Sequence, residues 1–333
     1  EIPIIADEYV DMSYGTGAVK ITPAHDPNDF EIAKRHDLPL ESIISPEGKM
    51  INVPAQFLGL TPVEARARVL EALEALELRR GETEIEHAVG HCYRCGSVIE
   101  PMIKEQWFIK TQSLAQPAID ALKKEEITFY PASKRKELIA YLEQLKDWNI
   151  SRQIPWGIPI PAFVNENDPK DWIFDTRTNE QSIVVNDTTY IREEDTFDTW
   201  FSSGQWPYIV TDYLTDGDLA NYFPTDMMET GMDIMRAWVS RMIMLSLYRT
   251  GKLPFKEVYL HGMVNDEHNQ KMSKSKGNVI NPMELVAEFG SDATRMGVIS
   301  GRAPAQSQAF NRGSVIAARN FCNKLWNIAR FVE

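Results

Sequence analysis

Hydrophobic residues recur at helical spacing in several stretches of the chain, and turn signals separate these stretches. The clearest lies at 61–80, where apolar side chains recur three or four residues apart. Thr61 is a candidate N-cap, Pro62 suits the first helical position, and Glu64 completes a capping box. The same spacing predicts further helices, at 113–125, 133–146, 233–250, 282–289 and 311–332.

Strand patterns alternate with these helices. Residues 1 to about 60 read as strands and turns, with the β-rich segments "GAVKIT" and "ESIISPEGKMINVP". Later, "MMETG" precedes the 233–250 helix and "VYLHGMV" follows it, which is the alternation expected of a parallel α/β sheet. The polar, turn-rich residues 164–196 read as a small β-hairpin insertion.

Composition narrows the class of protein. The 333 residues are enough for two domains, and 43% hydrophobic with 25% charged residues is ordinary for a globular protein. The net charge of −13 argues against a broad basic surface for nonspecific nucleic-acid binding, although a local basic site stays open. No apolar run approaches the roughly 18 residues that a bilayer span needs, so we expect no membrane partner.

The start of the chain and its cysteines bear on its origin. The sequence lacks an initiator Met and shows no signal peptide, so we interpret it as a piece of a longer protein. Its three cysteines, Cys92, Cys95 and Cys322, are too few for a disulfide scaffold and suit a reducing compartment. We therefore expect a cytoplasmic protein.

The stretch "HNQKMSKSKGNVINP" at 268–282 carries the most distinctive chemistry, with Lys271, Lys274 and Lys276 alternating with serines. A short Lys/Ser run is usually only a solvated loop. This one follows the strand pattern "VYLHGMV", and ligands of open α/β sheets bind beyond the carboxyl ends of the strands. Ammonium and hydroxyl groups at that place suit a polyphosphate, although the Walker pattern is absent.

"KMSKS" at 271–275 matches the second signature motif of the class I aminoacyl-tRNA synthetases, whose lysines stabilise the triphosphate while the amino acid attacks the α-phosphate of ATP. The rest of the chain is similar to this family too, and especially to its valyl branch. "TPAHDPND" resembles the editing domain, and "DWNISRQIPWG" and "DTWFSSGQWP" resemble the active-site wall. "RNFCNKLWNIARF" resembles the start of the anticodon-binding helices.

The resemblance implies an α/β fold, namely the second half of a class I synthetase Rossmann-type parallel sheet. Part of a β-rich editing domain is expected at 1–85, and the catalytic domain at 86–289 with a knuckle at 87–100. The start of an α-helical anticodon-binding domain is expected at 290–333. We expect the family's H-x-G-H motif, with the first half of the nucleotide fold, to lie outside these residues. The 333 residues alone would then neither charge nor edit tRNA.

The resemblance also implies roles for individual residues. The catalytic set is Lys271, Ser273, Lys274 and Ser275. The residues expected to bind ATP and the adenylate are Gly231, Asp233, His261, Gly262 and Met263. Trp200 and Trp238 match the tryptophans that shape the slot for an aliphatic amino acid. From the residues alone, these positions read equally as a helix cap, a structural strand-end histidine and two core tryptophans.

An editing site is expected because a pocket that accepts valine cannot strongly reject threonine, which has nearly the same volume. A second site that hydrolyses the mischarged product must hold an ammonium group. Asp26 and Asp29 of "HDPND" match the family's amino-group binders, and Lys20 and Thr22 belong to the same expected pocket. A turn and a helix start would explain "DPND" as well, and the two interpretations are compatible.

Cys92 and Cys95 stand at the C-x-x-C spacing of half a zinc site. A complete site needs a second pair, which in related synthetases precedes the editing domain. Zn²⁺ is therefore a hypothesis for the longer protein rather than for these residues alone.

The implied function is that of a valine–tRNA ligase. It would activate valine with ATP and Mg²⁺, transfer it to the 3′ end of tRNA(Val), and hydrolyse mischarged threonyl-tRNA(Val), as a monomer. The "WGIPIPAF" segment is closer to the isoleucyl pattern, so an isoleucyl-tRNA synthetase is one alternative. A non-catalytic nucleic-acid-binding paralogue is the other, and the intact lysine motif with Asp233 argues against it.

Overall fold

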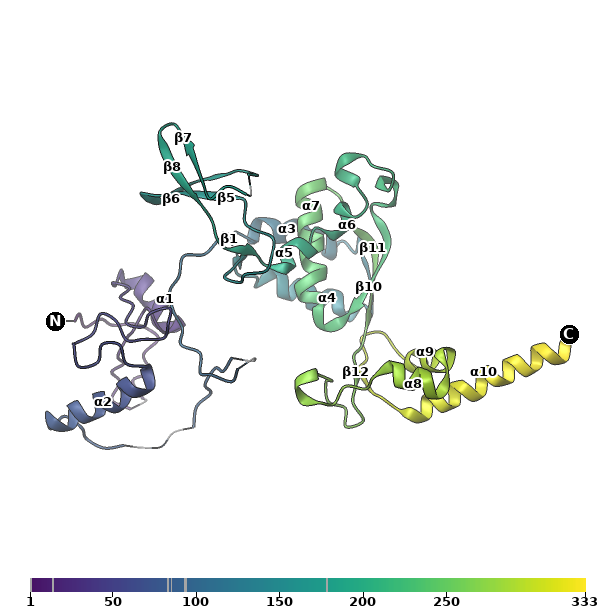
Figure 1. The fold of residues 1–333 in the computed structure, drawn as a ribbon, viewed down its shortest axis with the longest axis horizontal. Coiled ribbons are helices and arrows are strands. Elements are labelled where there is room, and N and C mark those ends of the chain that lie inside the picture. The colour runs from purple at the N-terminus through teal and green to yellow at the C-terminus, as the bar shows by residue number, and fades with distance from the viewer. Residues whose placement is uncertain (1, 14, 83, 85, 93–94, 178) are drawn as a thin grey trace. The chain divides into compact units, whose positions relative to one another are not determined.

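The computed structural model describes residues 2–13, 15–82, 84, 86–92, 95–177 and 179–333. Contacts divide the chain into two compact units, residues Glu1–Glu105 and Gln106–Glu333. Figure 1 labels the helices and strands of both units where there is room. Each unit is described by itself.

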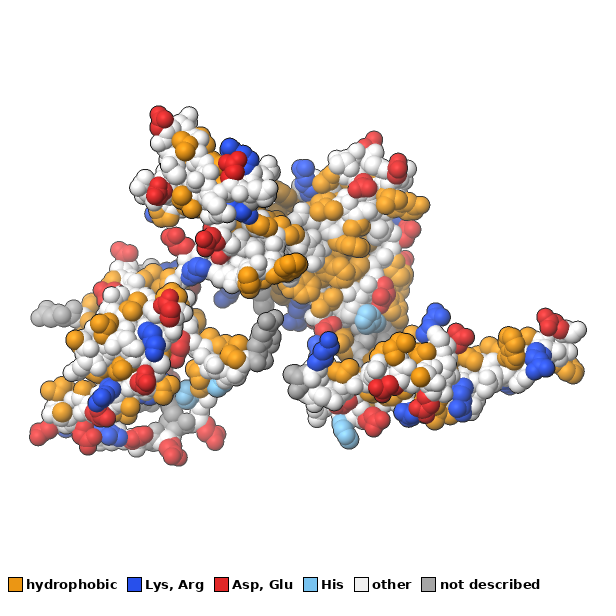
Figure 2. Space-filling view, in the orientation of Figure 1, with side chains coloured by type: hydrophobic (Ala, Val, Ile, Leu, Met, Phe, Trp, Pro, Cys, Tyr) orange, Lys and Arg blue, Asp and Glu red, His pale blue; other side chains and the backbone are white. Residues whose placement is uncertain are grey.

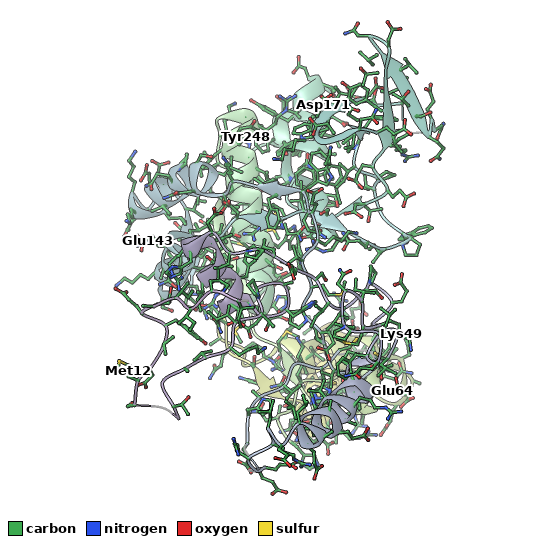
Figure 3. All side chains as sticks on the ribbon, turned by 90° about the vertical axis from the view of Figure 1, so that its left-hand side faces the viewer. Met12, Lys49, Glu64, Glu143, Asp171 and Tyr248 are labelled. Atoms are coloured by element: carbon green, nitrogen blue, oxygen red, sulfur yellow. The ribbon has the colours of Figure 1, made fainter. Side chains whose placement is uncertain are left out.

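The first unit contains the helices α1 (Pro27–His36) and α2 (Pro62–Ala75). The predicted capping box is confirmed, because Thr61 accepts a hydrogen bond from the Glu64 N–H and the Glu64 carboxylate accepts one from the Thr61 N–H at 2.8 Å. Glu64 is labelled in Figure 3. The helix ends at Ala75, earlier than predicted, and Glu77 just beyond it has a positive φ of 56° that is incompatible with a continuing helix.

The strands predicted in residues 1–60 were wrong. Among the described residues, this segment has only an isolated bridge between Ile44 and Met50 and the helix α1. No described strand lies alongside residues 18–22, so the β-rich composition of "GAVKIT" has no ladder to join. Ile44 and Met50 pack instead with Ala65 of α2 in a small hydrophobic cluster.

The second unit is built on a three-stranded parallel sheet of β2 (Thr128–Tyr130), β10 (Thr225–Gly231) and β11 (Phe255–His261), in the order β10-β11-β2. Gly231 pairs with His261 at the end of the β10–β11 ladder. The predicted parallel α/β sheet is thus confirmed, and the carboxyl ends of β10 and β11 meet at one edge.

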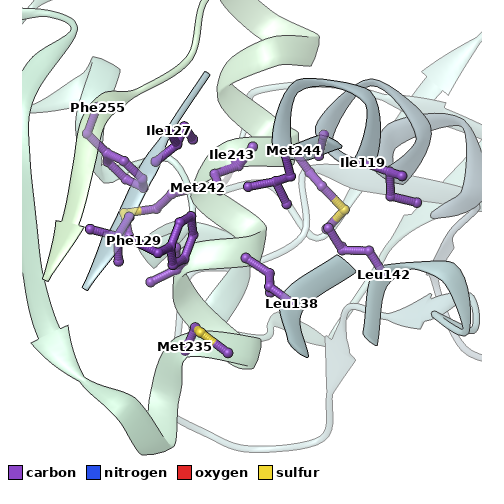
Figure 4. Packing of buried hydrophobic residues seen from close by; sticks show 14 of the residues in the cluster. Ile119, Ile127, Phe129, Leu138, Leu142, Met235, Met242, Ile243, Met244 and Phe255 are labelled. Carbon is purple, nitrogen blue, oxygen red and sulfur yellow. The ribbon is translucent and has the colours of Figure 1, made fainter. Parts of the chain in front are cut away.

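Helices α3 (Gln112–Lys123), α4 (Ser133–Glu143) and α7 (Ser240–Thr250) pack with this sheet in one core. Figure 4 shows side chains of β2 and β11 meeting those of α7. Residues 241–245 of α7 are all buried, so α7 lies in the interior. The helix predicted at 233–250 is three consecutive segments, a 3₁₀ turn η3 (Met232–Ile234), a π-helical turn η4 (Met235–Val239) and α7.

The predicted hairpin insertion is larger than expected. It is a four-stranded antiparallel sheet of β5 (Ala162–Asn165), β6 (Asp168–Phe174), β7 (Ser182–Val185) and β8 (Thr188–Arg192), in the order β6-β5-β8-β7. Asn186 and Asp187 both have positive φ at the β7–β8 turn, as a two-residue hairpin loop requires.

Short elements make up the rest of this unit before β10. They are β1 (Phe108–Ile109), β3 (Trp148–Asn149), β4 (Ser151–Arg152), β9 (Thr196–Phe197), α5 (Thr199–Ser203), α6 (Trp206–Ile209), η1 (Tyr213–Thr215) and η2 (Ala220–Tyr222). β4 pairs with β9, and the Asp198 N–H donates to the Ile150 carbonyl at 2.7 Å, so "DWNISRQIPWG" lies beside the start of "DTWFSSGQWP".

After the sheet, β12 (Val264–Asn265) pairs with β13 (Gln308–Ala309), and a group of helices follows. These helices are α8 (Pro282–Phe289), α9 (Ser291–Ile299) and α10 (Arg312–Val332). The predictions for α8 and α10 are confirmed, whereas α9 was not predicted. Within the described part of the chain, no helix combines the length and the apolar character needed to cross a membrane.

Candidate nucleotide site

Polar groups gather at the carboxyl ends of β10 and β11, which we call the sheet edge. A Cβ atom on Gly231 would lie 2.7 Å from Oδ1 of Asp233, so glycine is needed for this carboxylate to approach the backbone. His261 ends β11, and its Nδ1 is hydrogen-bonded to the carboxylate of Glu229 on β10. Gly231, Asp233 and His261, three of the residues expected to bind ATP and the adenylate, are therefore brought together, and their roles stay a prediction.

The backbone after His261 is packed against another segment. A Cβ atom on Gly262 would lie 2.0 Å from the carbonyl oxygen of Gln306. The Met263 N–H donates to Oγ of Ser307 at 3.0 Å, and the Met263 carbonyl accepts from the Gln308 N–H at 3.0 Å. Gly262 and Met263 thus have a structural role that the sequence did not indicate, because they join β11 to residues 306–308.

Residues 266–278, which we call the lysine loop, carry the signature motif. The loop contains the 3₁₀ turn η5 (Lys274–Lys276), and Gly277 follows it with a φ of 67°. Asp266 at its start is 9% exposed, and hydrogen bonds from the Asn278 side chain and from the Gln270 and His268 N–H groups hold its pKa below the usual value. Asn278 at the end of the loop bonds to the Asp266 carboxylate at 2.8 Å.

Met272 anchors the loop to the helical group. Its side chain packs against the cluster that includes Leu285, Phe289 and Phe310, and its sulfur accepts the Ile280 N–H at 3.5 Å. The one apolar residue of the signature motif therefore points toward the protein while Lys271 and Lys274 stay exposed, which follows from the difference in hydration of the side chains.

The loop reaches the sheet edge through Lys271. Nζ of Lys271 lies 3.3 Å from Oδ2 of Asp233, and the two side chains are 67% and 36% exposed. The Ser273 N–H donates to Oδ1 of Asn278 at 2.9 Å. The Ser275 side chain lies outside what the structure describes. Charged side chains of both signs are dispersed over the face seen in Figure 2. The lysine loop carries three lysines in a chain whose net charge is −13.

The two tryptophans of the expected amino-acid slot come from neighbouring elements. Trp200 lies on α5, which packs against η4, and η4 carries Trp238. Nε1 of Trp238 donates to the carbonyl of Ser203 at 2.9 Å. Both tryptophans are partly buried. A π-helical turn such as η4 widens a helix by one residue and is frequent at functional sites.

A buried polar group supports the wall next to Trp200. The Asp198 carboxylate accepts from Nε1 of Trp148 at 2.9 Å and pairs with Arg152 at 2.9 Å. Its Oδ1 also accepts the Trp200 N–H at 3.3 Å, and the Arg241 guanidinium stacks over the Trp148 ring at 4.5 Å. Asp198 therefore joins segments 50 residues apart in the chain.

In the first unit, the four residues of the expected editing pocket lie together. Asp26 caps α1, and its Oδ1 accepts from the Asn28 and Asp29 N–H groups at 2.8 and 3.1 Å. The buried Asp29 accepts the Thr22 N–H through Oδ2 at 2.7 Å. Lys20 donates to Oγ1 of Thr22 at 2.9 Å. The turn and helix start that would also explain "DPND" are thus present. An editing role for these residues stays a prediction.

Backbone hydrogen bonds join described residues on either side of positions 93–94 in the cysteine knuckle. The Cys92 N–H donates to the Ser97 carbonyl at 2.8 Å, and the Gly96 N–H donates to the Cys92 carbonyl at 2.8 Å. Hydrogen bonds from Ser97 and Cys92 lower the pKa of Cys95 to about 7. Among the described residues, no group of three or more Cys, His, Asp or Glu side chains could hold a metal ion. The described donors therefore do not complete a zinc site, and zinc stays a prediction for the longer protein.

Comparison with known proteins fits this geometry. A family model described as tRNA synthetases class I (I, L, M and V) matches residues 8–309. The chain belongs to this family. The valine–tRNA ligase of Symbiobacterium thermophilum is 44% identical over 100% of this chain and 36% of its own length. The valine–tRNA ligase of Treponema denticola is 44% identical over 100% of this chain and 37% of its own length. The valine–tRNA ligase of Carboxydothermus hydrogenoformans is 42% identical over 99% of this chain and 38% of its own length.

The predicted resemblance to the valyl branch of the class I synthetases is confirmed by these relatives, of which the chain spans little more than a third. Among solved structures, a methionyl-tRNA synthetase of Mycobacterium tuberculosis bound by methionyl-adenylate is 20% identical, with a TM-score of 0.49 over 72% of this chain and 42% of that chain. A LeuRS of Agrobacterium radiobacter in a complex with tRNA and LeuAMS is 24% identical. Its TM-score is 0.45, and the match covers 59% of this chain and 31% of that chain.

The sequence did not indicate several residues of this candidate site. Glu229 was missed because only the strand register brings it next to His261. Asp266 and Asn278 were missed although a signal exists, since Asp and Asn flanking a loop often bond to nearby N–H groups. Asp198 is the first residue of the segment "DTWFSSGQWP", and the sequence indicated no separate role for it.

Proposed function

We propose that the protein to which these residues belong activates valine with ATP and transfers it to tRNA(Val). The observation that supports this most directly is the 3.3 Å contact between Lys271 and Asp233, because it joins the signature loop to the sheet edge. A cationic loop and a sugar-binding carboxylate at the carboxyl end of a parallel sheet are what an ATP-dependent ligase needs.

In this proposal, Gly231 and Asp233 hold the ribose, since the missing Cβ leaves the backbone open and the carboxylate accepts hydroxyl hydrogens. Lys271 and Lys274 bind the triphosphate and neutralise the charge that grows on the pyrophosphate leaving group. Mg²⁺ would enter with ATP, since magnesium is usually held largely by substrate phosphates and one or two carboxylates.

Valine as the amino acid is supported by the names of the relatives and by the two tryptophans on α5 and η4. An apolar slot between aromatic side chains suits an aliphatic substrate. Isoleucine is the alternative, and the amino acid that drives ATP–pyrophosphate exchange in the whole protein distinguishes the two.

The substitution Lys274→Ala in the whole protein tests the proposed chemistry. We expect pyrophosphate exchange to slow by about 100-fold or more, while the KM for valine changes little, because the lysine acts on phosphate charge rather than on the amino acid. Lys256→Ala is the control, since Lys256 lies at the start of β11 and pairs with the exposed Asp226. Equal exchange rates for Lys274→Ala and the unsubstituted protein would refute the assignment.

We further propose that residues 1–85 take part in editing, residues 86–289 in activation and residues 290–333 in the junction to the anticodon-binding region. The editing proposal is supported by the cluster of Asp26, Asp29, Thr22 and Lys20. Each carboxylate uses one oxygen in the hydrogen bonds described above, so the other can face a substrate ammonium group.

Asp26→Asn separates the two roles of this carboxylate, because asparagine caps helices as well as aspartate does but carries no charge. In the whole protein we expect hydrolysis of threonyl-tRNA(Val) to slow by about tenfold or more, with the thermal stability preserved. Hydrolysis at the original rate would leave Asp26 with its capping role alone.

A further inference from the structure

The two polar residues at the ends of the lysine loop share one set of hydrogen bonds. Oδ1 of Asp266 accepts the His268 N–H at 3.0 Å and the Gln270 N–H at 2.7 Å. Oδ2 of Asp266 accepts from Nδ2 of Asn278 at 2.8 Å. Oδ1 of Asn278 accepts the Ser273 N–H at 2.9 Å. The carboxylate and the amide thus connect the start, the middle and the end of the loop.

These bonds act on the backbone next to the lysines. Asn278 fixes the N–H of Ser273, which lies immediately before Lys274, and its Nδ2 also lies 3.3 Å from the Lys271 carbonyl. Asp266 is nearly buried and bonds to these neutral N–H donors. It therefore organises the loop while the ammonium groups of the lysines remain exposed for a polyanion.

We propose that Asp266 and Asn278 are positioning residues, whose mutual hydrogen bond holds the lysine loop in the geometry that binds the triphosphate. This inference rests on the proposed function and adds to it two residues that do not touch the substrate. Long lysine side chains on an exposed loop have many conformations, so a fixed backbone reduces the entropy lost when they bind phosphate.

The pair allows a sharp test because exchanging its two side chains preserves their mutual hydrogen bond and the bonds from the backbone N–H groups, and loses only the longer 3.3 Å bond from Nδ2 of Asn278 to the Lys271 carbonyl. In Asp266→Asn, the new amide must turn its NH₂ either toward the NH₂ of Asn278 or toward the two backbone N–H groups. In Asn278→Asp, two carboxylates face each other and repel. In the double variant, the amide now at position 266 donates to the carboxylate now at position 278, while both side chains still accept the backbone N–H groups.

The measurement is steady-state ATP–pyrophosphate exchange by the whole protein, with kcat and KM determined separately for ATP and for valine. We expect each single variant to lower kcat/KM for ATP by about tenfold or more, as misplaced charge-assisted contacts would. The double variant should recover to within about threefold of the original value. The KM for valine should stay unchanged in all three, which also reports that the variants are folded.

Asn281→Ala is the matched structural control, because Asn281 caps α8 through a 3.0 Å bond to the Met283 N–H just after the loop. It removes a local hydrogen bond without changing the loop, so we expect kcat/KM for ATP to stay the same.

The outcomes are distinguishable. Single variants that match the original enzyme while Lys274→Ala is impaired would overturn the positioning role and leave the proposed function intact. A double variant as impaired as the singles, with an unchanged KM for valine, would overturn it as well. Lys274→Ala without an effect would refute the proposed function itself.

Discussion

The sheet edge and the lysine loop face the same candidate nucleotide site, yet different interactions hold them. At the sheet edge, backbone packs on backbone, because Gly262 lies against Gln306 and the Leu260 carbonyl accepts the Ala305 N–H at 2.6 Å. In the lysine loop, the hydrogen bond between Asp266 and Asn278 holds the segment instead.

The difference teaches which changes each part tolerates. Backbone packing leaves no room for added atoms but depends little on nearby charges. A loop held by side-chain hydrogen bonds has room for added atoms but depends on matched donors and acceptors. In the proposed function, the packed edge positions the ribose groups, and the hydrogen-bonded loop positions the lysines for the phosphates.

The largest expected effect is on the sheet edge. Gly262→Ala places a Cβ at 2.0 Å from a backbone oxygen that cannot rotate away, so we expect a loss of about 3 kcal/mol or more in stability. Amide hydrogen exchange of residues 260–265 and 305–310 in the whole protein measures this loss of stability.

Gly277→Ala is the comparison within the loop. Nothing lies within 4 Å of the added atom, and only the positive φ of 67° opposes it, so the expected cost is about 1–2 kcal/mol. If both substitutions have the same cost, the contrast between backbone packing and an open loop is wrong.

The smallest expected effect on stability concerns the contact between the two parts. Lys271→Ala and Asp233→Asn each break an exposed ion pair, so unfolding in urea should shift by less than about 0.5 kcal/mol. Both should raise the KM for ATP, since both side chains are proposed to bind the nucleotide. A shift above about 1.5 kcal/mol in either variant would mean that the pair is a structural link between loop and edge.

Local features of the fold were predictable because neighbours in the sequence satisfy them. The capping box at Thr61 and the bounds of α8 depend on residues within one helical turn. The strand predicted at 17–22 failed because strand propensity requires a partner strand, and none lies beside it among the described residues. Residues 41–54 pair only with themselves, through the single bridge between Ile44 and Met50. The four-stranded insertion was underestimated for a related reason, since the pairing of β5 with β8, which joins its two hairpins into one sheet, is not local.

The candidate site also divides into residues that the sequence predicted and contacts that it did not predict. The lysine motif, Asp233 and the two tryptophans came from the sequence through their resemblance to a family. The sequence did not predict which side chains contact each other, because the partners are far apart along the chain. Lys271 and Asp233 are 38 residues apart, and His261 and Glu229 are 32 residues apart.

The sequence by itself thus indicated the helices α2, α3, α4, α8 and α10, the parallel α/β class and the residue types of the candidate polyphosphate site, since periodicity and caps are local properties. Only the tertiary structure decided that Gly231 lies opposite His261, that Lys271 meets Asp233, and that Asp266 bonds to Asn278. These contacts depend on strand register and chain reversal, which the spacing of residues along the chain does not specify.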